Sequence, residues 1–363
     1  MTTTTDLTAE LPVRTRARLP RAGYAPGART SSTKDPDVPL CRLASNEMAL
    51  GPLPEVMEML RSEEAVHRYP DPTAAVLRRA IADHVGVEVD QVATGAGSVA
   101  LVDLLLRLVA GDGDEVVVGA PSFGAYSTLA ATAGTRAVGV PLRGTSMDLD
   151  AMAGAMTERT RAVFVCTPNN PTGGCVSAAE VRSFVESVPS DTLVVLDEAY
   201  REFVVSSDPV DGVDLLGAHP NLVTLRTFSK AYGLAGLRVG YAVADPSVVR
   251  ALTALQAPFS VNAPAQAAAL AALATHEQTM ARVGDVVQER ERVIELLRSA
   301  GVDAPDSQGN FVWLPLGERT AVVHSALERA GVLTRPFAGQ GIRATIGTPA
   351  EDDQLVAALV ARS

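Results

Sequence analysis

Lysine is rare in this chain, and one of its lysines stands out by position. Of the 31 lysine and arginine residues, only Lys34 and Lys230 are lysines. Arginine serves wherever a positive charge is enough, but it cannot deprotonate to a nucleophilic amine or form a Schiff base. Lys34 lies in a polar stretch, whereas Lys230 lies between two apolar segments within residues 226–240. We therefore expect Lys230 to carry amine chemistry.

Two motifs follow apolar runs that are typical of buried strands. Asp197 ends the run 193–197, where a carboxylate is costly to bury unless it meets a cation or caps a helix. The loop 166–173 contains two amides, Asn169 and Asn170, held between prolines. Taken alone, the carboxylate could form a structural salt bridge and the loop could be an ordinary turn.

A third motif, Thr-Gly-Ala-Gly-Ser at residues 94–98, leads into a helical pattern. Its backbone N–H groups and the Ser98 hydroxyl could bind a phosphate at the helix N-terminus. Such a turn is weak evidence by itself. The combination is far more specific, because Lys230 is also followed eight positions later by Arg238. A phosphate cradle, a strand-end carboxylate, an amide loop and an isolated lysine together indicate a site for pyridoxal 5'-phosphate.

The elements between residues 91 and 244 could bring these groups together. The predicted strands are 115–119, 136–140, 162–166, 192–197, 222–225 and 239–244. The predicted helices among them are 98–110, 123–133, 149–156 and 178–187. This alternation predicts a mostly parallel sheet covered on both faces, with ligands at the carboxyl ends of its strands.

The pattern changes after Pro246 to long alanine-rich helical stretches. These predicted helices cover 246–257 and 262–300, and strands at 309–315 and 341–347 and a helix at 349–362 follow. We therefore predict an α/β fold with two domains. The large domain, 41–250, has three layers around a mostly parallel sheet. Residues 1–40 form an N-terminal arm, and with residues 251–363 they make up the second part, a smaller α+β domain.

Composition limits the classes of function. The net charge of −11 argues against a nucleic-acid-binding surface and favours a small-molecule partner. No apolar run is long enough to span a membrane, and the start of the chain does not resemble a signal peptide. Three cysteines, Cys41, Cys166 and Cys175, cannot all pair and match no metal-binding template. We expect a cytoplasmic protein without disulfides or a bound metal.

The motifs resemble those of fold-type I pyridoxal 5'-phosphate-dependent aminotransferases, in the histidinol-phosphate aminotransferase family. The matching segments, in family order, are 43–47, 68–71, 168–173, 197–200, Ser229-Lys230, Arg238 and 343–347. Within the family, the chain is most similar to the actinobacterial aromatic amino acid (phenylalanine) aminotransferases. The resemblance runs from about residue 43 to residue 349.

The resemblance implies a role for each residue around the cofactor ring. Lys230 would bind the cofactor covalently and then move the proton between the substrate and the cofactor. Asp197 would pair with the pyridine nitrogen and keep it protonated. Asn170 and Tyr200 would hydrogen-bond the phenolic oxygen, and Phe123 would stack on the ring.

The resemblance also implies how the phosphate is held and how subunits assemble. The phosphate ligands would be Gly97, Ser98, Thr227, Ser229 and Arg238, with Tyr69 reaching in from a second subunit. That contact predicts a homodimer with shared active sites.

On the substrate side, Arg343 matches the family arginine that grips the α-carboxylate, for which a guanidinium provides a two-pronged donor. Arg335 aligns with a second family arginine near the substrate. Asn46 and Glu47 are expected at the entrance. Their segment, 46–52, departs from the sequence that many family members carry there, so substrate contacts of that loop do not transfer.

Several features favour the aromatic branch. No acidic residue follows Ser98, and the segments 51–54, 258–262 and 310–317 agree with that branch. Phe259 and Tyr24 are then expected to line an aromatic pocket. The expected reaction moves the amino group between an aromatic amino acid, phenylalanine first, and 2-oxoglutarate.

Three other functions stay open at this point. Histidinol phosphate as amino donor would need partners for its phosphate, which Arg16, Arg18, Arg21 and Tyr24 could supply, although such a basic cluster is equally typical of a solvated arm. Decarboxylases of amino-acid phosphates use a similar scaffold. A cofactor-binding regulatory protein would usually carry a DNA-binding domain, for which the N-terminal segment is too short.

Overall fold

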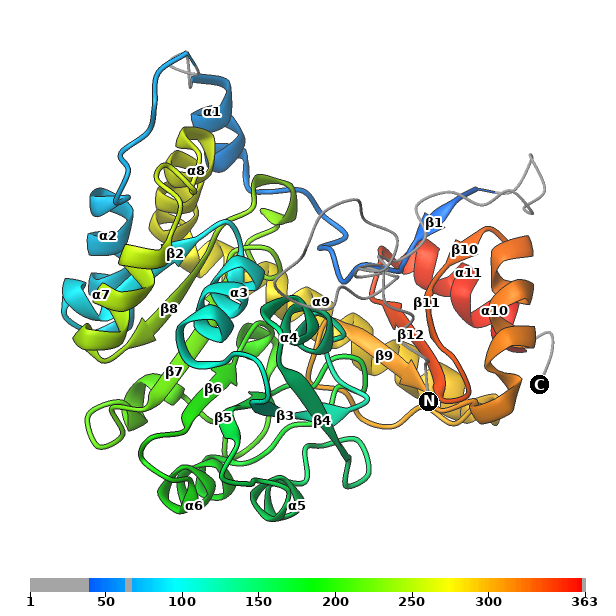
Figure 1. The fold of residues 1–363 in the computed structure, drawn as a ribbon. Coiled ribbons are helices and arrows are strands. Elements are labelled where there is room, and N and C mark those ends of the chain that lie inside the picture. Colours follow the sequence, from blue (N-terminus) through cyan, green and yellow to red (C-terminus); the bar gives the residue numbers. More distant parts are fainter. Residues whose placement is uncertain (1–38, 63–66, 361–363) are drawn as a thin grey trace, which may run out of the picture.

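The computed structural model describes residues 39–62 and 67–360 (Figure 1). Nearly all of the predicted arm lies outside the described residues, including Arg16, Arg18, Arg21, Tyr24 and Lys34. Within the described part, no helix is long and apolar enough to cross a membrane.

The large sheet has seven strands in the order β2-β8-β7-β6-β5-β3-β4. Their bounds are β2 Val92–Gly95, β3 Glu115–Ala120, β4 Arg136–Pro141, β5 Thr160–Cys166, β6 Leu193–Asp197, β7 Leu222–Thr227 and β8 Gly240–Ala244. Strand β8 runs opposite to the other six strands and is antiparallel to both of its neighbours, β2 and β7. The register places Cys166 beside Asp197 and Asp197 beside Leu225, so three neighbouring strands end at one edge.

Helices cover both faces of this sheet, as predicted. They are α3 Ser98–Val109, α4 Ala125–Ala133, α5 Leu149–Gly154 and α6 Ala178–Ser187. Right-handed crossovers between parallel strands place α3 and α4 on one face and α5 and α6 on the other, and Figure 1 shows these two pairs on opposite sides. Apart from the edge strand β4, the strands are buried from both sides, which explains their nearly continuous apolar sequences.

A second, smaller group of elements lies beside the large sheet (Figure 1). Its antiparallel sheet has the order β11-β12-β9, with β9 Phe311–Leu314, β11 Arg335–Phe337 and β12 Gly341–Thr345. Helices α10 Thr320–Arg329 and α11 Pro349–Val360 accompany it. Strand β1, Cys41–Arg42, pairs in parallel with β10, Val332–Leu333. The α/β class with a mostly parallel large sheet and a smaller α+β part is therefore confirmed.

The remaining helices connect or flank the two parts. They are α1 Pro54–Ser62, α2 Ala75–Val85, α7 Pro246–Leu255, α8 Ala263–Ala274 and α9 His276–Ser299. Short 3-10 helices cover Val89–Gln91, Arg201–Phe203, Gly212–Leu215, Ala235–Leu237 and Gly317–Arg319. The single helical stretch predicted over 262–300 is wrong in one respect, because α8 ends at Ala274 and α9 begins at His276.

Two apolar clusters form the core of the described residues, and helix α9 contributes to both. One face of α8, with Ala265, Ala268, Ala269 and Ala272, packs into the large cluster, as does Val283 of α9. The second cluster contains Val293 and Leu297 from the other half of α9, together with Cys41 of β1. Helix α9 therefore belongs to both clusters, and the apolar core divides along this helix.

Candidate active site

The carboxyl ends of β5, β6 and β7 meet the first turn of α3 around a cavity of about 520 Å³. The predicted site residues that line it are Glu47, Ser98, Phe123, Asn170, Asp197, Tyr200, Thr227, Ser229, Lys230, Arg238 and Arg343. Side chains alternate along an extended strand, so Thr227 faces the cavity while Arg226 faces away from it. Residues more than 290 positions apart in the sequence thus meet at one site.

Lys230 lies in this cavity with its amine held by backbone oxygens. Its Nζ donates to the carbonyl of Ser45 at 3.1 Å and to that of Asn46 at 3.0 Å. Burial, with further contributions from the nearby Arg343 and Arg238 charges, lowers the pKa of Lys230 from 10.5 to about 7. Near neutral pH, a large fraction of the amine is therefore unprotonated and nucleophilic.

Asp197 is 4% exposed and lies at the end of β6. One carboxylate oxygen, Oδ2, accepts a 2.5 Å hydrogen bond from the hydroxyl of Tyr126, and the other accepts from the backbone N–H of Ala199 at 3.1 Å. Burial raises the pKa of Asp197, while these two donors oppose that rise. Sequence reasoning missed Tyr126, which on its own looks like one more apolar residue of a helix.

Asp197 is followed by a carboxylate that faces the opposite way. Glu198 is 1% exposed and accepts from Arg226 Nε at 2.8 Å, and Arg226 also donates to Asp211. This buried ion pair supports the sheet behind the cavity and does not line it.

A cradle for an anion forms where α3 begins. Gly97 has a φ of +79°, a conformation that favours glycine. A Cβ at this position would overlap Nη2 of Arg238 and lie 3.1 Å from its Cζ. The guanidinium thus lies against the turn, with Nη1 3.4 Å from the Ser229 hydroxyl. Hydroxyls, a guanidinium and the helix N-terminus converge here, as phosphate binding requires.

Arg343 reaches the cavity from β12 of the smaller part. It is 6% exposed, and its two terminal nitrogens donate at 2.5 Å to Oδ1 of Asn170 and to the carbonyl of Ala44. The amide oxygen of Asn170 therefore accepts from Arg343, and its amide nitrogen can still donate a hydrogen bond. The neighbouring Asn169 is instead used inside the loop, where it bonds Ser122 and Thr172.

Asn46 does not lie at the entrance, which corrects the prediction. It is fully buried, and its Nδ2 donates to the Tyr200 hydroxyl at 3.0 Å. Its Oδ1 accepts from the hydroxyl of Thr345 at 3.1 Å. The side chain is therefore held by protein groups, and Tyr200 accepts from Asn46 while its own proton stays available for donation. Glu47, by contrast, lines the cavity as expected.

Arg335, Tyr69 and Phe259 also lie outside the cavity lining. Arg335 is opposite Arg343 in the β11–β12 pair and lies over the ring of Phe337 at 5.9 Å. Tyr69 is 83% exposed, and its ring stacks on that of Phe259 with centroids 4.5 Å apart. The predictions that Phe259 lines the substrate pocket and that Arg335 contacts substrate therefore gain no support within this single chain.

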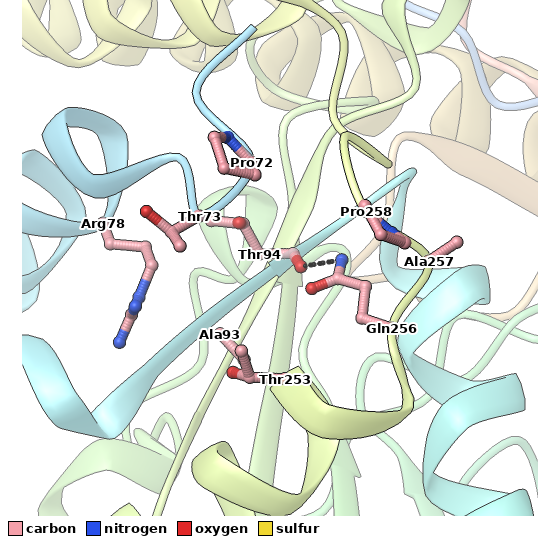
Figure 2. A pocket seen from close by; sticks show the side chains of 9 residues that line it. All are labelled: Pro72, Thr73, Arg78, Ala93, Thr94, Thr253, Gln256, Ala257 and Pro258. Atoms are coloured by element: carbon pink, nitrogen blue, oxygen red, sulfur yellow. Dashed lines mark hydrogen bonds between the residues drawn. The ribbon is translucent and has the colours of Figure 1, made fainter.

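A second pocket lies between β2 and the segment that follows α7 (Figure 2), and its volume is about 190 Å³. The amide nitrogen of Gln256 donates to the carbonyl of Thr94 at 2.7 Å. The Arg78 guanidinium donates to the carbonyls of Val89 and Val92. Because these groups already have partners and none of the predicted residues lines this pocket, we assign it no chemistry.

Comparison with known proteins defines the class. The family model of class I and II aminotransferases matches residues 38–359. The chain therefore belongs to the class I and II aminotransferase family.

Relatives bear a more particular name. A Rhodococcus jostii protein named aromatic amino acid aminotransferase is 50% identical over 318 residues, which is 87% of this chain and 88% of the relative. A Streptomyces coelicolor protein of the same name is 48% identical over 333 residues, or 91% and 92% of the two chains. Similarity at this level over nearly the full length agrees with the resemblance seen in the motifs.

Solved structures show the same architecture. The histidinol-phosphate aminotransferase from Sinorhizobium meliloti, in complex with pyridoxal-5'-phosphate, superimposes with a TM-score of 0.85 at 30% identity and covers 89% of this chain and 91% of its own. The aspartate aminotransferase from Thermus thermophilus with maleate gives 0.79 at 24% identity, over 89% and 92% of the two chains. The second likeness concerns the fold alone.

Proposed function

We propose that this protein is a pyridoxal 5'-phosphate-dependent aminotransferase that moves the amino group between an aromatic amino acid, phenylalanine first, and 2-oxoglutarate. The observation that carries the proposal is the Lys230 amine, with its lowered pKa, in a cavity also lined by Asp197 and Arg343. The names of relatives near 50% identity support the substrate class. The same amine and carboxylate would serve both half-reactions.

The residues fit this cofactor. The cavity volume lies in the range of small-molecule sites, which is roughly 300–1,000 Å³. The turn at Gly97 leaves room that a Cβ would fill, beside the Arg238 guanidinium and the first N–H groups of α3. Ser98, Thr227 and Ser229 add hydroxyls. These groups would hold the phosphate.

When bound, the cofactor supplies an electron-accepting ring. Asp197 would hold a proton at the ring nitrogen, and Phe123 would cover one ring face. The free amide nitrogen of Asn170 and the hydroxyl proton of Tyr200 are both donors, so they would orient the ring through its phenolic oxygen. These two roles follow from the hydrogen bonds within the protein, because the Asn170 amide oxygen already accepts from Arg343 and the Tyr200 hydroxyl oxygen already accepts from Asn46.

Lys230 and Arg343 would act on the substrate. Arg343 can exchange Asn170 and Ala44 for the two oxygens of an α-carboxylate, which a guanidinium binds in a two-pronged manner. Nζ of Lys230 would take the proton from the substrate α carbon, for which a pKa of about 7 is well matched. Arg343 of the smaller part would thus bind the substrate, and Lys230, which follows β7 of the large sheet, would deprotonate it.

The exposed aromatic pair supports a homodimer. Tyr69 and Phe259 stack on each other outside the lining of their own cavity, and Val76 and Leu255 are also exposed. A stacked aromatic pair that is exposed in one chain can be buried by a second subunit. In the proposed dimer, Tyr69 of the partner subunit completes the phosphate site. Light scattering of the wild-type protein and of Tyr69→Ala tests this assembly.

We also place the enzyme in the cytoplasm. Support comes from the cysteines, since Cys41, Cys166 and Cys175 are all free and thiols stay reduced in that compartment. Fractionation of cells followed by detection of the protein tests this placement.

A single half-reaction tests the proposed function. The protein is loaded with pyridoxal 5'-phosphate and mixed separately with phenylalanine and histidinol phosphate while the cofactor absorption is followed. Rapid conversion by phenylalanine is the expected result. Preferential conversion by histidinol phosphate would contradict the aromatic substrate and favour the second candidate, which the Sinorhizobium meliloti likeness supports. Conversion by neither would contradict both.

The matched variants use the chain's two lysines. Lys230→Ala is expected to abolish turnover and the covalent absorption band, because arginine-rich surroundings offer no replacement amine. Lys34→Ala is the control and should leave both unchanged. Normal turnover by Lys230→Ala would contradict the site assignment.

A further inference from the structure

Tyr126 is a buried side chain that touches the proposed cofactor partner without lining the cavity. It lies on α4, is 1% exposed, and donates its hydroxyl to Oδ2 of Asp197 at 2.5 Å. The other oxygen of Asp197 is held by the backbone N–H of Ala199. Each carboxylate oxygen therefore has one protein donor, from a different element.

The ring of Tyr126 is held as firmly as its hydroxyl. It stacks on Phe164 with centroids 4.9 Å apart and an interplanar angle of 27°. It also meets the ring of Phe123 edge to face at 5.4 Å and 90°. Phe123 is the residue proposed to cover the cofactor ring. Tyr126 thus supports both groups proposed to meet that ring, one through a hydrogen bond and one through packing.

The Tyr126 hydroxyl stabilises the charged form of the Asp197 carboxylate. Burial raises the pKa of Asp197 and so opposes its charge, while the Tyr126 hydrogen bond acts in the opposite direction. Tyr126 cannot share that charge, because burial and the Asp197 carboxylate raise its own pKa well above 10. It therefore stays a neutral donor. Hydrogen bonds from a neutral donor to a carboxylate are among the stronger ones in proteins.

We propose that Tyr126 is a positioning residue of the reaction: its hydroxyl orients the Asp197 carboxylate toward the cofactor's ring nitrogen and stabilises the charge needed there. This inference rests on the proposed function. It goes beyond the residues that the family resemblance implies, since Tyr126 acts through Asp197 and contacts neither substrate nor cofactor.

The test is Tyr126→Phe in the full-length protein loaded with pyridoxal 5'-phosphate. The first readout is the pH midpoint of the cofactor's visible absorption change, which a purely structural role would not move. Losing a charge-assisted hydrogen bond corresponds to roughly one to two pKa units at the carboxylate. A ring nitrogen with less positive charge withdraws fewer electrons, so the midpoint should rise, by roughly half a unit or more. We also expect kcat for phenylalanine to fall about tenfold, with KM within about twofold.

Tyr241→Phe is the matched control. Tyr241 is also a buried tyrosine, 5% exposed, but it lies on β8 opposite Arg226, on the side away from the cavity. This variant loses the same atom and should keep the wild-type midpoint. An unchanged midpoint in Tyr126→Phe, or the same shift in both variants, would overturn the inference.

A second measurement decides if Tyr126→Phe does not fold. A buried hydroxyl proton that is hydrogen-bonded to a carboxylate should give a proton resonance in the wild-type protein, protected from exchange, that disappears in Asp197→Ala. Its absence would overturn the inference. The proposed function fails differently, because wild-type protein that does not convert phenylalanine contradicts the substrate whatever the midpoint of the variant.

Discussion

Gly97→Ala is the change whose consequence can be worked out most directly from the structure. At φ +79° and ψ 160°, a backbone region that is essentially restricted to glycine, an alanine carries a conformational cost of roughly 1–3 kcal/mol. Its Cβ would lie 3.1 Å from Cζ of Arg238, inside the 3.4–4 Å of ordinary contact, and closer still to Nη2. The guanidinium would have to move away from the start of α3. It could then no longer share a phosphate with the N–H groups there.

The expected loss is one charge-assisted hydrogen bond, about 1.5–3 kcal/mol. At 1.4 kcal/mol per factor of ten, the Kd for pyridoxal 5'-phosphate should rise roughly 10- to 150-fold. Quenching of the chain's single tryptophan, Trp313, during cofactor titration measures this value. Gly217→Ala is the control, because nothing lies within 4 Å of its added Cβ and its φ is not positive. A wild-type Kd for Gly97→Ala would refute the cradle.

The remaining predictions concern substrate, proton and fold. Arg343→Lys should raise KM for phenylalanine, measured by steady-state kinetics, about 10- to 100-fold, because one point charge replaces a two-pronged donor. The cofactor Kd of this variant, measured by titration, should stay within about threefold of wild type. A lysine pKa of about 7 means that the rate of cofactor incorporation should climb from pH 6 to 8 and then level off, as stopped-flow absorption would show; a steady climb toward pH 10 would contradict the lowered pKa of Lys230. Glu198→Gln removes the fully buried carboxylate paired with Arg226 and leaves only the partly exposed Asp211 as its anion. Urea unfolding should then show a loss of about 3 kcal/mol, the low end for breaking a buried pair, and a loss below about 1 kcal/mol would contradict this reasoning.

Much of the large sheet could be predicted because its strands are buried on both faces. Residues 115–119 and 222–225 are mostly apolar, and the strands that they form are longer by only one or two residues. The antiparallel direction of β8 could not be read from its sequence, since an apolar run carries no sign of direction. The break between α8 and α9 was missed because the helical pattern continues through Thr275.

The site shows the same contrast between local and distant information. Lys230 and Asp197 could be singled out because an isolated lysine and a strand-end carboxylate are unusual by themselves. Asn46 was misplaced and Tyr126 missed because their roles depend on partners 154 and 71 residues away. Arg335 and Phe259 came from the resemblance alone, and their predicted contacts still await a test in the assembled enzyme.

Helix α9 has a mechanical consequence for substrate binding. Its 24 residues contain no proline and span about 36 Å, with one half rooted in the core of the large sheet and the other in the core around β12. Movement of one part relative to the other would therefore tilt this helix. A tilt of about 5° about its midpoint displaces each end by about 1.6 Å, enough to make or break a hydrogen bond. In the proposed reaction, a rotation of only a few degrees would then be enough for Arg343 to exchange Asn170 for a substrate carboxylate.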